Sequence, residues 1–160
     1  MQGKRLAAGA LALAFGLQGL TTLLIGYNGL TTLVVLGLLL YGFYQYGRAL
    51  GKGKLWLYPV AGLLLAFLTL PFAIGWMAGS KSLVQALIFL VLYATATSAV
   101  AMYPLLLLRE PLKSEELTWA YWGIVLAPLL GLLHPLVGRI AATAANAYAA
   151  WLFFRHWNES

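Results

Sequence analysis

The chain has 160 residues, of which 62% are hydrophobic and 9% are charged, whereas soluble domains carry about 25% charged residues. A water-soluble core cannot bury that much apolar surface, so the composition excludes an ordinary soluble domain and indicates an integral membrane protein in a lipid bilayer. The absence of cysteine excludes disulfides and thiolate metal sites. The net charge of +6 comes without any nucleic-acid-binding motif, so membrane orientation explains it better than a nucleic-acid partner.

The first part of the chain predicts two membrane helices joined by a turn. As one helix, the uncharged run 6–47 would reach about 63 Å, twice the thickness of the hydrocarbon core. The break is expected at Gly26-Tyr27-Asn28-Gly29, because Asn-Gly is a strong turn signal. The sequence therefore predicts helices over about 5–25 and 29–48. The length of the first apolar run favours an uncleaved span over a signal peptide.

The next segment predicts a helix that contains a proline. A glycine and lysine loop at 51–54 ends the second helix, and a third helix is expected over about 55–78, with Pro59 in its first turn. Pro71 inside this helix should kink it and deprive the carbonyl of Phe67 of its helical donor.

A fourth helix is expected over about 82–108. Ser82, with Gln85 three residues later, fits the capping box that starts a helix. The segment 93–98 is the most polar part of any predicted membrane centre.

The last part of the chain predicts a helical hairpin. In the hydrophilic stretch 109–116, Ser114 is placed to cap the next helix. The apolar run that follows is too long for one crossing, and the His134-Pro135 pair is its natural corner. We therefore expect helices over about 117–133 and 136–157.

Together these segments define an all-α, polytopic integral membrane protein, a bundle of six transmembrane helices in a single domain over residues 1–160. The alternative is five spans, because the helix over 117–133 is short and Pro128 bends it. Five spans would leave Arg139 deep in lipid, at a cost of about 2.5 to 3.5 kcal/mol.

The charges predict the orientation of the six spans. One face then carries eight cations, Lys4, Arg5, Arg48, Lys52, Lys54, Arg109, Lys113 and Arg155, and the other carries Lys81 and Arg139. Because cations concentrate on cytoplasmic loops, both termini are expected in the cytoplasm, and the membrane is expected to be a prokaryotic cytoplasmic membrane.

The helix over 136–157 carries the first candidate site residue, Asn146. Two neighbouring strips of this helix consist almost entirely of small residues: Ala141, Ala145 and Ala149 on one, and Ala142, Asn146 and Ala150 on the other. Small residues mark the face where membrane helices approach each other closely. Asn146 is therefore expected to hold this helix against a neighbour, either the fourth helix or the first.

The alternative for Asn146 is contact with a ligand in a midmembrane cavity, together with Thr95, Thr97 and Ser98 of the fourth helix. Gln18 on the first helix is a further candidate for ligand binding or packing, because its amide is difficult to satisfy in lipid.

The sequence offers no catalytic residue, metal site or cofactor. Each of the four carboxylates, Glu110, Glu115, Glu116 and Glu159, falls in a predicted loop or tail, which argues against a proton pump. The two histidines, His134 and His156, stand at opposite ends of a helix about 30 Å long.

These features favour a non-catalytic small membrane protein that works by helix packing, as an accessory subunit of a membrane complex or as a self-associating scaffold. Its partners would be other membrane subunits or further copies of itself. The alternative is a small transporter or membrane-embedded binding protein for a neutral or apolar ligand, for which the prolines and the polar centre of the fourth helix argue.

Overall fold

The computed structural model describes residues 2–25 and 29–159, and every regular element in these ranges is an α-helix. The helices are α1 (Gln2–Leu24), α2 (Gly29–Leu50), α3 (Leu57–Gly79), α4 (Leu83–Ala101), α5 (Pro104–Leu108), α6 (Glu116–Leu130) and α7 (Pro135–Glu159). The all-α prediction is confirmed. The predicted Asn-Gly turn falls on residues 26–28, which lie outside the described residues.

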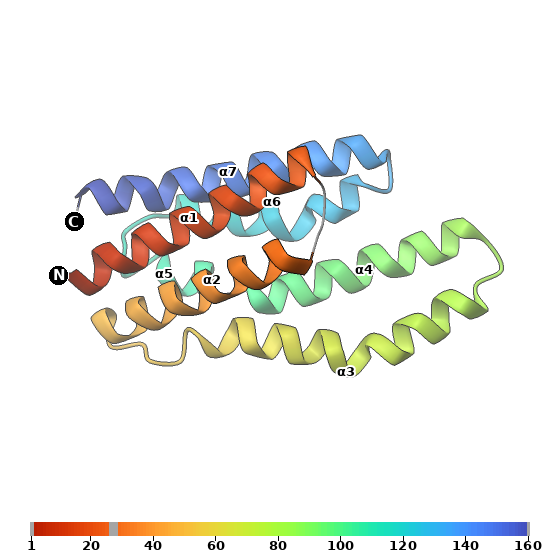
Figure 1. The fold of residues 1–160 in the computed structure, drawn as a ribbon, viewed down its shortest axis with the longest axis horizontal. Helices are drawn as coiled ribbons and strands as arrows, with labels where there is room; N and C mark the ends of the chain where they lie inside the picture. Colours follow the sequence, from red (N-terminus) through yellow and green to blue (C-terminus); the bar gives the residue numbers. More distant parts are fainter. Residues whose placement is uncertain (1, 26–28, 160) are drawn as a thin grey trace.

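The helices form two parts of different character (Figure 1). The buried core comes from α1, α2, α5, α6 and α7 together with Leu55, and we call these helices the bundle. Rings from three of them meet in this core: Phe15 stacks on Phe153 with centroids 5.9 Å apart, and Tyr46 lies 6.1 Å from Phe153.

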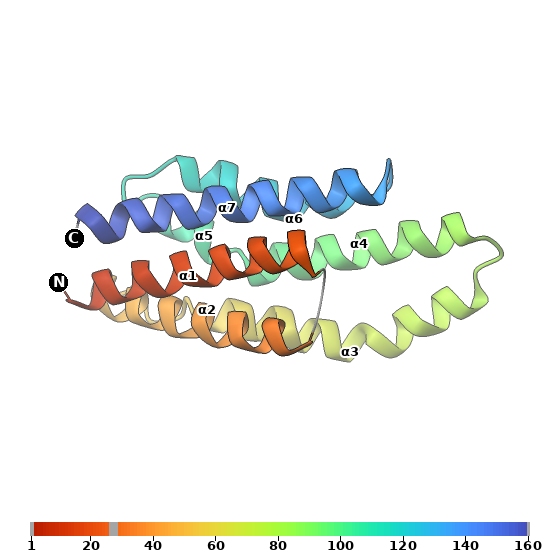
Figure 2. The ribbon, with the colours of Figure 1, turned by 45° about the horizontal axis from the view of Figure 1, so that its top comes forward.

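The second part is the antiparallel pair α3 and α4, which we call the hairpin. Its far end extends beyond the bundle in both views of the ribbon (Figures 1 and 2). No described residue of α4 is buried, and only Pro59, Gly62 and Ala73 are buried in α3. The hairpin joins the bundle mainly through α4, which packs against α6, and Tyr121 of α6 donates a hydrogen bond of 3.0 Å to the Ala99 carbonyl.

The helix ends follow local backbone chemistry. α2 ends at Gly51, whose φ of +72° is left-handed, and the Lys52 N–H donates to the Gly47 carbonyl at 2.8 Å, which is the Schellman arrangement. At the start of α4 the Ser82 Oγ accepts from the Gln85 N–H at 3.2 Å. The capping role predicted for Ser82 is therefore confirmed.

Two local predictions are wrong. The helix expected over 82–108 is interrupted at Met102 and Tyr103, because Pro104 has no N–H to continue the ladder. Ser114 does not cap α6, because the residue before α6 is Glu115 and the buried Ser114 Oγ has no hydrogen-bond partner among the described residues. The Ser114 N–H instead donates to the Arg109 carbonyl at 2.9 Å, and Lys113 takes a left-handed φ of 52°. The serine thus closes the preceding helical turns, as the residue after a left-handed cap does.

Four helical segments are long and apolar enough to span a membrane, namely Gly3–Leu24, Gly29–Leu50, Leu57–Gly79 and Leu83–Leu108. α6 is apolar but has only 15 residues, fewer than the roughly 20 that a perpendicular crossing needs. It ends at Leu130, three residues before the expected end at 133. The structure therefore gives four membrane-spanning candidates among its described helices, fewer than the six expected.

Arg139 has a structural partner at the end of α1. Its Nε donates to the Thr22 carbonyl at 2.6 Å, and its Nη2 donates to the Leu23 carbonyl at 2.9 Å. The last carbonyls of a helix have no intrahelical donor, so this guanidinium satisfies them. The contact ties the beginning of α7 to the end of α1.

Candidate functional site

α7 lies against two helices, α1 and α6, and its two strips of small residues divide between them. On the first strip, Ala149 is fully buried, and the Ala145 Cβ lies 3.2 Å from the position that a Cβ on Gly123 of α6 would occupy. The small residues of both helices are thus what lets α6 and α7 approach so closely.

The second strip of α7 faces glycines of α1. A Cβ on Gly16 would lie 3.8 Å from the Ala150 Cβ, and a Cβ on Gly19 would lie 3.3 Å from the Asn146 Cβ. About two turns from the Gly16–Ala150 contact, toward the two termini, a Cβ on Gly9 would lie 3.2 Å from the Trp157 ring. α1 and α7 therefore run antiparallel in close contact along most of their length.

Asn146 is 7% exposed and sits in this α1–α7 interface. Its Nδ2 donates to the Ala142 carbonyl of its own helix at 2.8 Å. The amide therefore has a hydrogen-bond acceptor without reaching across to another helix. Gln18, half-buried on α1, stands next to the glycine that faces Asn146.

The polar residues of α4 lie elsewhere, because α4 packs against α3 and α6. The Thr97 hydroxyl donates to the carbonyls of Tyr93 and Ala94, at 3.0 and 3.1 Å. The Thr95 Oγ1 is buried and has no hydrogen-bond partner among the described residues. Thr95, Thr97 and Ser98 thus share a helix with one another but not an interface with Asn146.

A polar cluster that sequence reasoning missed joins α6 to α7. Glu116 was expected in a loop, but it is the first residue of α6. Its Oε1 lies 3.4 Å from the Arg155 Nη2, and its Oε2 accepts from the Tyr148 hydroxyl at 3.3 Å. The seven-residue spacing of Tyr148 and Arg155, two helical turns, was the available signal that both share a face.

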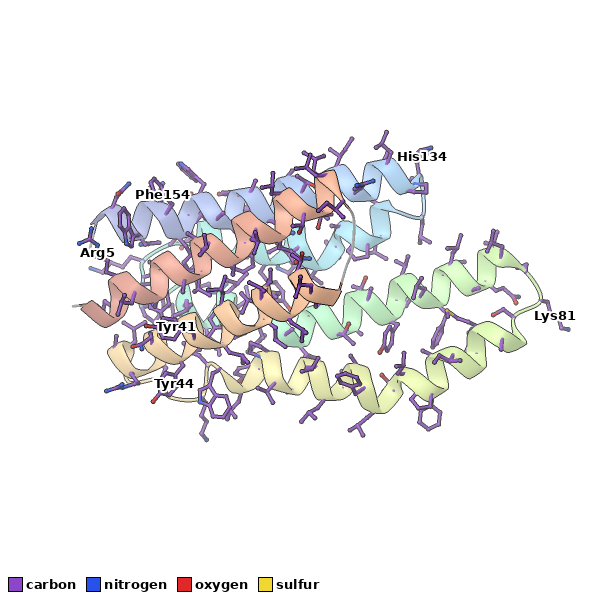
Figure 3. All side chains as sticks on the ribbon, viewed as in Figure 1. Arg5, Tyr41, Tyr44, Lys81, His134 and Phe154 are labelled. Carbon is purple, nitrogen blue, oxygen red and sulfur yellow. The ribbon has the colours of Figure 1, made fainter. Side chains whose placement is uncertain are left out.

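The described part of the chain also has two surface hollows. One, of about 450 Å³, is a groove between α1 and α7 lined by Gly9, Ala12, Leu13, Ala150, Trp151, Phe154 and Trp157. The other, of about 600 Å³, lies near the tip of the hairpin and includes Trp76, Lys81, Gln85 and Phe89. In Figure 3, Arg5 and Phe154 lie at the end of the molecule that holds both termini, and Lys81 lies at the opposite end.

Within the described residues no group of three His, Asp or Glu side chains is close enough together to hold a metal ion. No protein family, curated protein or solved structure matches this chain.

Proposed function

We propose that this chain is a non-catalytic integral membrane protein that works by helix packing, as a self-associating scaffold or an accessory subunit of a membrane complex. The observation that carries this proposal is the hairpin, whose helices lack a covering layer from the bundle. In the 18-residue apolar window of Leu83–Leu108, 0% of the residues are buried.

Two features of the hairpin favour a protein neighbour over lipid alone. Cβ atoms built on Gly75 and Gly79 would meet nothing within 4 Å, so a small-residue surface of the kind that packs membrane helices stays open. Pro71 also deprives the Phe67 carbonyl of its helical donor, and Phe67 is 63% exposed. A carbonyl in lipid that lacks its helical donor needs one from a neighbouring helix or a water, and a helix of a partner is one such donor.

A bulky residue at Gly75 tests the proposal. Because a Cβ at Gly75 would meet no described atom within 4 Å, Gly75→Leu should leave the fold intact and weaken only assembly. Gly37→Leu on α2 is the matched control, since Gly37 is equally open within the chain. We expect native mass spectrometry of protein extracted from its own membranes to show an assembly that Gly75→Leu disrupts and Gly37→Leu preserves. A wild-type chain that is always a lone monomer would refute the proposal.

The proposed topology has six spans with both termini in the cytoplasm. Both termini lie at one end of the molecule (Figure 1), which an even number of crossings requires. α7 is 25 residues long, and cover from α1 and α6 on two sides lessens its need for an apolar surface. Tilt of α7 relative to the bilayer and local thinning near α6 would accommodate the short helix.

Cysteine labelling in this cysteine-free chain tests the topology. Lys81 and Lys113 are both exposed, so Lys81→Cys should react with an impermeant reagent in intact cells, and Lys113→Cys only after permeabilisation. His134→Cys should react from outside if α6 and α7 both cross. The reverse pattern at 81 and 113 would overturn the orientation, and a protected 134 would favour five spans.

The alternative, a small transporter or membrane-embedded binding protein for a neutral or apolar ligand, remains a prediction. One form of it has Asn146 contact the ligand in a shared cavity with Thr95, Thr97 and Ser98. Their separation onto different helix pairs favours the packing proposal.

A further inference from the structure

The groove between α1 and α7 combines an apolar channel with a cation at its end. Its floor consists of the small residues Gly9, Ala12 and Ala150. Its walls are large and open to the surroundings: Leu13 is 60% exposed, Trp151 51% and Phe154 52%. On α7 its lining runs from Ala150 to Trp157, about 10 Å along the helix, which is well over half the depth of the hydrocarbon in one bilayer leaflet.

Two guanidinium groups lie on the aromatic walls of this groove. Arg5 stands 4.6 Å from the centroid of the Trp157 ring, and Arg155 stands 4.9 Å from that of Trp151. Among the described side chains the one ion pair is between Arg155 and Glu116. The charge of Arg5 is therefore held against an aromatic ring, with no carboxylate paired to it in the described part of the chain.

We propose that this groove binds an anionic phospholipid, with an acyl chain along Gly9, Ala12 and Ala150 and the phosphate on Arg5. The apolar channel fits an alkyl chain, and the cation at the end that holds the termini fits a phosphodiester at the membrane surface. The charges argue against a second copy of this chain, because symmetric docking through the groove would bring two copies of Arg5 together, and Arg5 has no carboxylate partner among the described residues.

Lipid titration of the purified full-length protein in detergent tests this proposal. The probes are phosphatidylglycerol, phosphatidylcholine with the same acyl chains, and glycerol phosphate, and binding is read by native mass spectrometry. Wild-type protein should retain phosphatidylglycerol in preference to phosphatidylcholine. Arg5→Gln should bind phosphatidylglycerol about fivefold more weakly, the factor that one surface cation contributes toward an anionic lipid, and Arg5→Lys should recover most of the affinity.

Two matched controls separate the groove from general surface charge and bulk. Arg48→Gln removes a cation that also stands over an aromatic ring, 5.9 Å from the Tyr44 centroid, outside the groove. It should leave binding unchanged. Ala12→Phe fills the groove and should abolish retention of phosphatidylglycerol, whereas Ala61→Phe, at an exposed position of α3, should not.

Three outcomes would overturn the proposal. Equal losses in Arg5→Gln and Arg48→Gln would show general charge attraction. Glycerol phosphate that competes as well as the whole lipid would show a headgroup site without an acyl channel. A dimer that Ala12→Phe dissociates would assign the groove to a second copy. None of these outcomes bears on assembly through the hairpin, so the two proposals fail independently.

Discussion

The hairpin is built from more apolar sequence than α1 and α2 of the bundle, but it buries less of that sequence. The segments that contain α3 and α4 have the highest mean hydropathy, 2.0 each, and are the least buried, whereas α1 and α2 have values of 1.6 and 1.3 and are buried more. In water the most apolar helix would lie innermost. In a bilayer, lipid is as apolar as leucine, so the most apolar helices can face outward.

The side chains at the interfaces explain the difference. The bundle places small residues where helices meet, as at Ala145 against Gly123 and Ala150 against Gly16, and fills the remaining space with stacked rings. Of the glycines in the hairpin, only Gly62 at its base makes a comparably close contact, where an added Cβ would lie 2.8 Å from the Ala101 Cβ. Small residues, more than hydropathy, thus identify which membrane helices are packed.

The largest expected effect is overpacking in the bundle. Ala149→Leu and Ala145→Leu add bulk where the first side chain is fully buried and the second already touches α6 closely. Overpacking typically costs about 1 to 3 kcal/mol, so both variants should lower the melting temperature in detergent clearly. Ala96→Leu makes the same change in the hairpin. Because Ala96 is exposed, this variant should leave the melting temperature nearly unchanged.

Ala144→Leu is the control on the same helix, since Ala144 is exposed and leucine there extends into lipid. If leucine at 145 and 149 changes the melting temperature as little as leucine at 144, this face of α7 contacts lipid, and the bundle is no more closely packed than the hairpin.

The second effect concerns Arg139, which joins α7 to the end of α1. Arg139→Leu leaves the carbonyls of Thr22 and Leu23 without these donors. Hydrogen bonds to charged groups contribute about 1.5 to 3 kcal/mol when buried, but one of these bonds is exposed and the other only part-buried, so we expect a smaller loss than from overpacking. We expect a lower melting temperature and faster amide exchange in the last turn of α1. Arg139→Lys should restore part of the stability, because an ammonium can reach a carbonyl but cannot donate in the same fork. Unchanged exchange in α1 would contradict this role.

Much of the helix layout could be predicted from the sequence, because it depends on local signals. The glycine loop after α2, the serine cap of α4 and the His134-Pro135 corner each act within a few residues. The break at Met102 and Tyr103 was also local, but the significance of Pro104 was overlooked. The role of Ser114 could not be predicted from its residue type, since its backbone N–H bonds the carbonyl of Arg109 in the preceding turn.

The candidate site was less predictable, because it depends on which helices become neighbours. The alanine strips of α7 predicted close packing, and α1 was one of two neighbours expected for Asn146. Apolar chains of this kind carry little periodicity to distinguish one partner helix from another. The small ridge Ala8, Ala12 and Gly16 of the first helix indicated a contact with some helix but did not name α7. The glycines at positions 9, 16 and 19 face Trp157, Ala150 and Asn146 of α7 in antiparallel order.

The third prediction is a modest effect for Asn146→Ala. The amide bonds a carbonyl of its own helix, so its loss removes no bond between helices. Side-chain hydrogen bonds in membrane proteins average about 0.6 kcal/mol, and the melting temperature should fall less than in Ala145→Leu. If Asn146→Ala keeps its stability but loses a bound ligand, the residue belongs to a binding site, and the transporter alternative gains support over the packing proposal.

The smallest effects use two tyrosines to ask whether the hairpin unfolds with the bundle or separately. The Tyr121 hydroxyl bonds the Ala99 carbonyl between α6 and α4, and the Tyr93 hydroxyl bonds the Ala66 carbonyl between α4 and α3. Tyr121→Phe and Tyr93→Phe each remove one hydroxyl, with a cost of about 0.6 kcal/mol.

Because Tyr121 belongs to the buried core, loss of its hydroxyl should lower the temperature of the global melting transition. Tyr93 lies in a part with few contacts to the core, so its loss should instead speed amide exchange in α3 and α4 and leave the melting temperature unchanged, as expected for a unit that opens locally. Equal shifts in global melting from both variants would show that the bundle and the hairpin unfold as one cooperative unit.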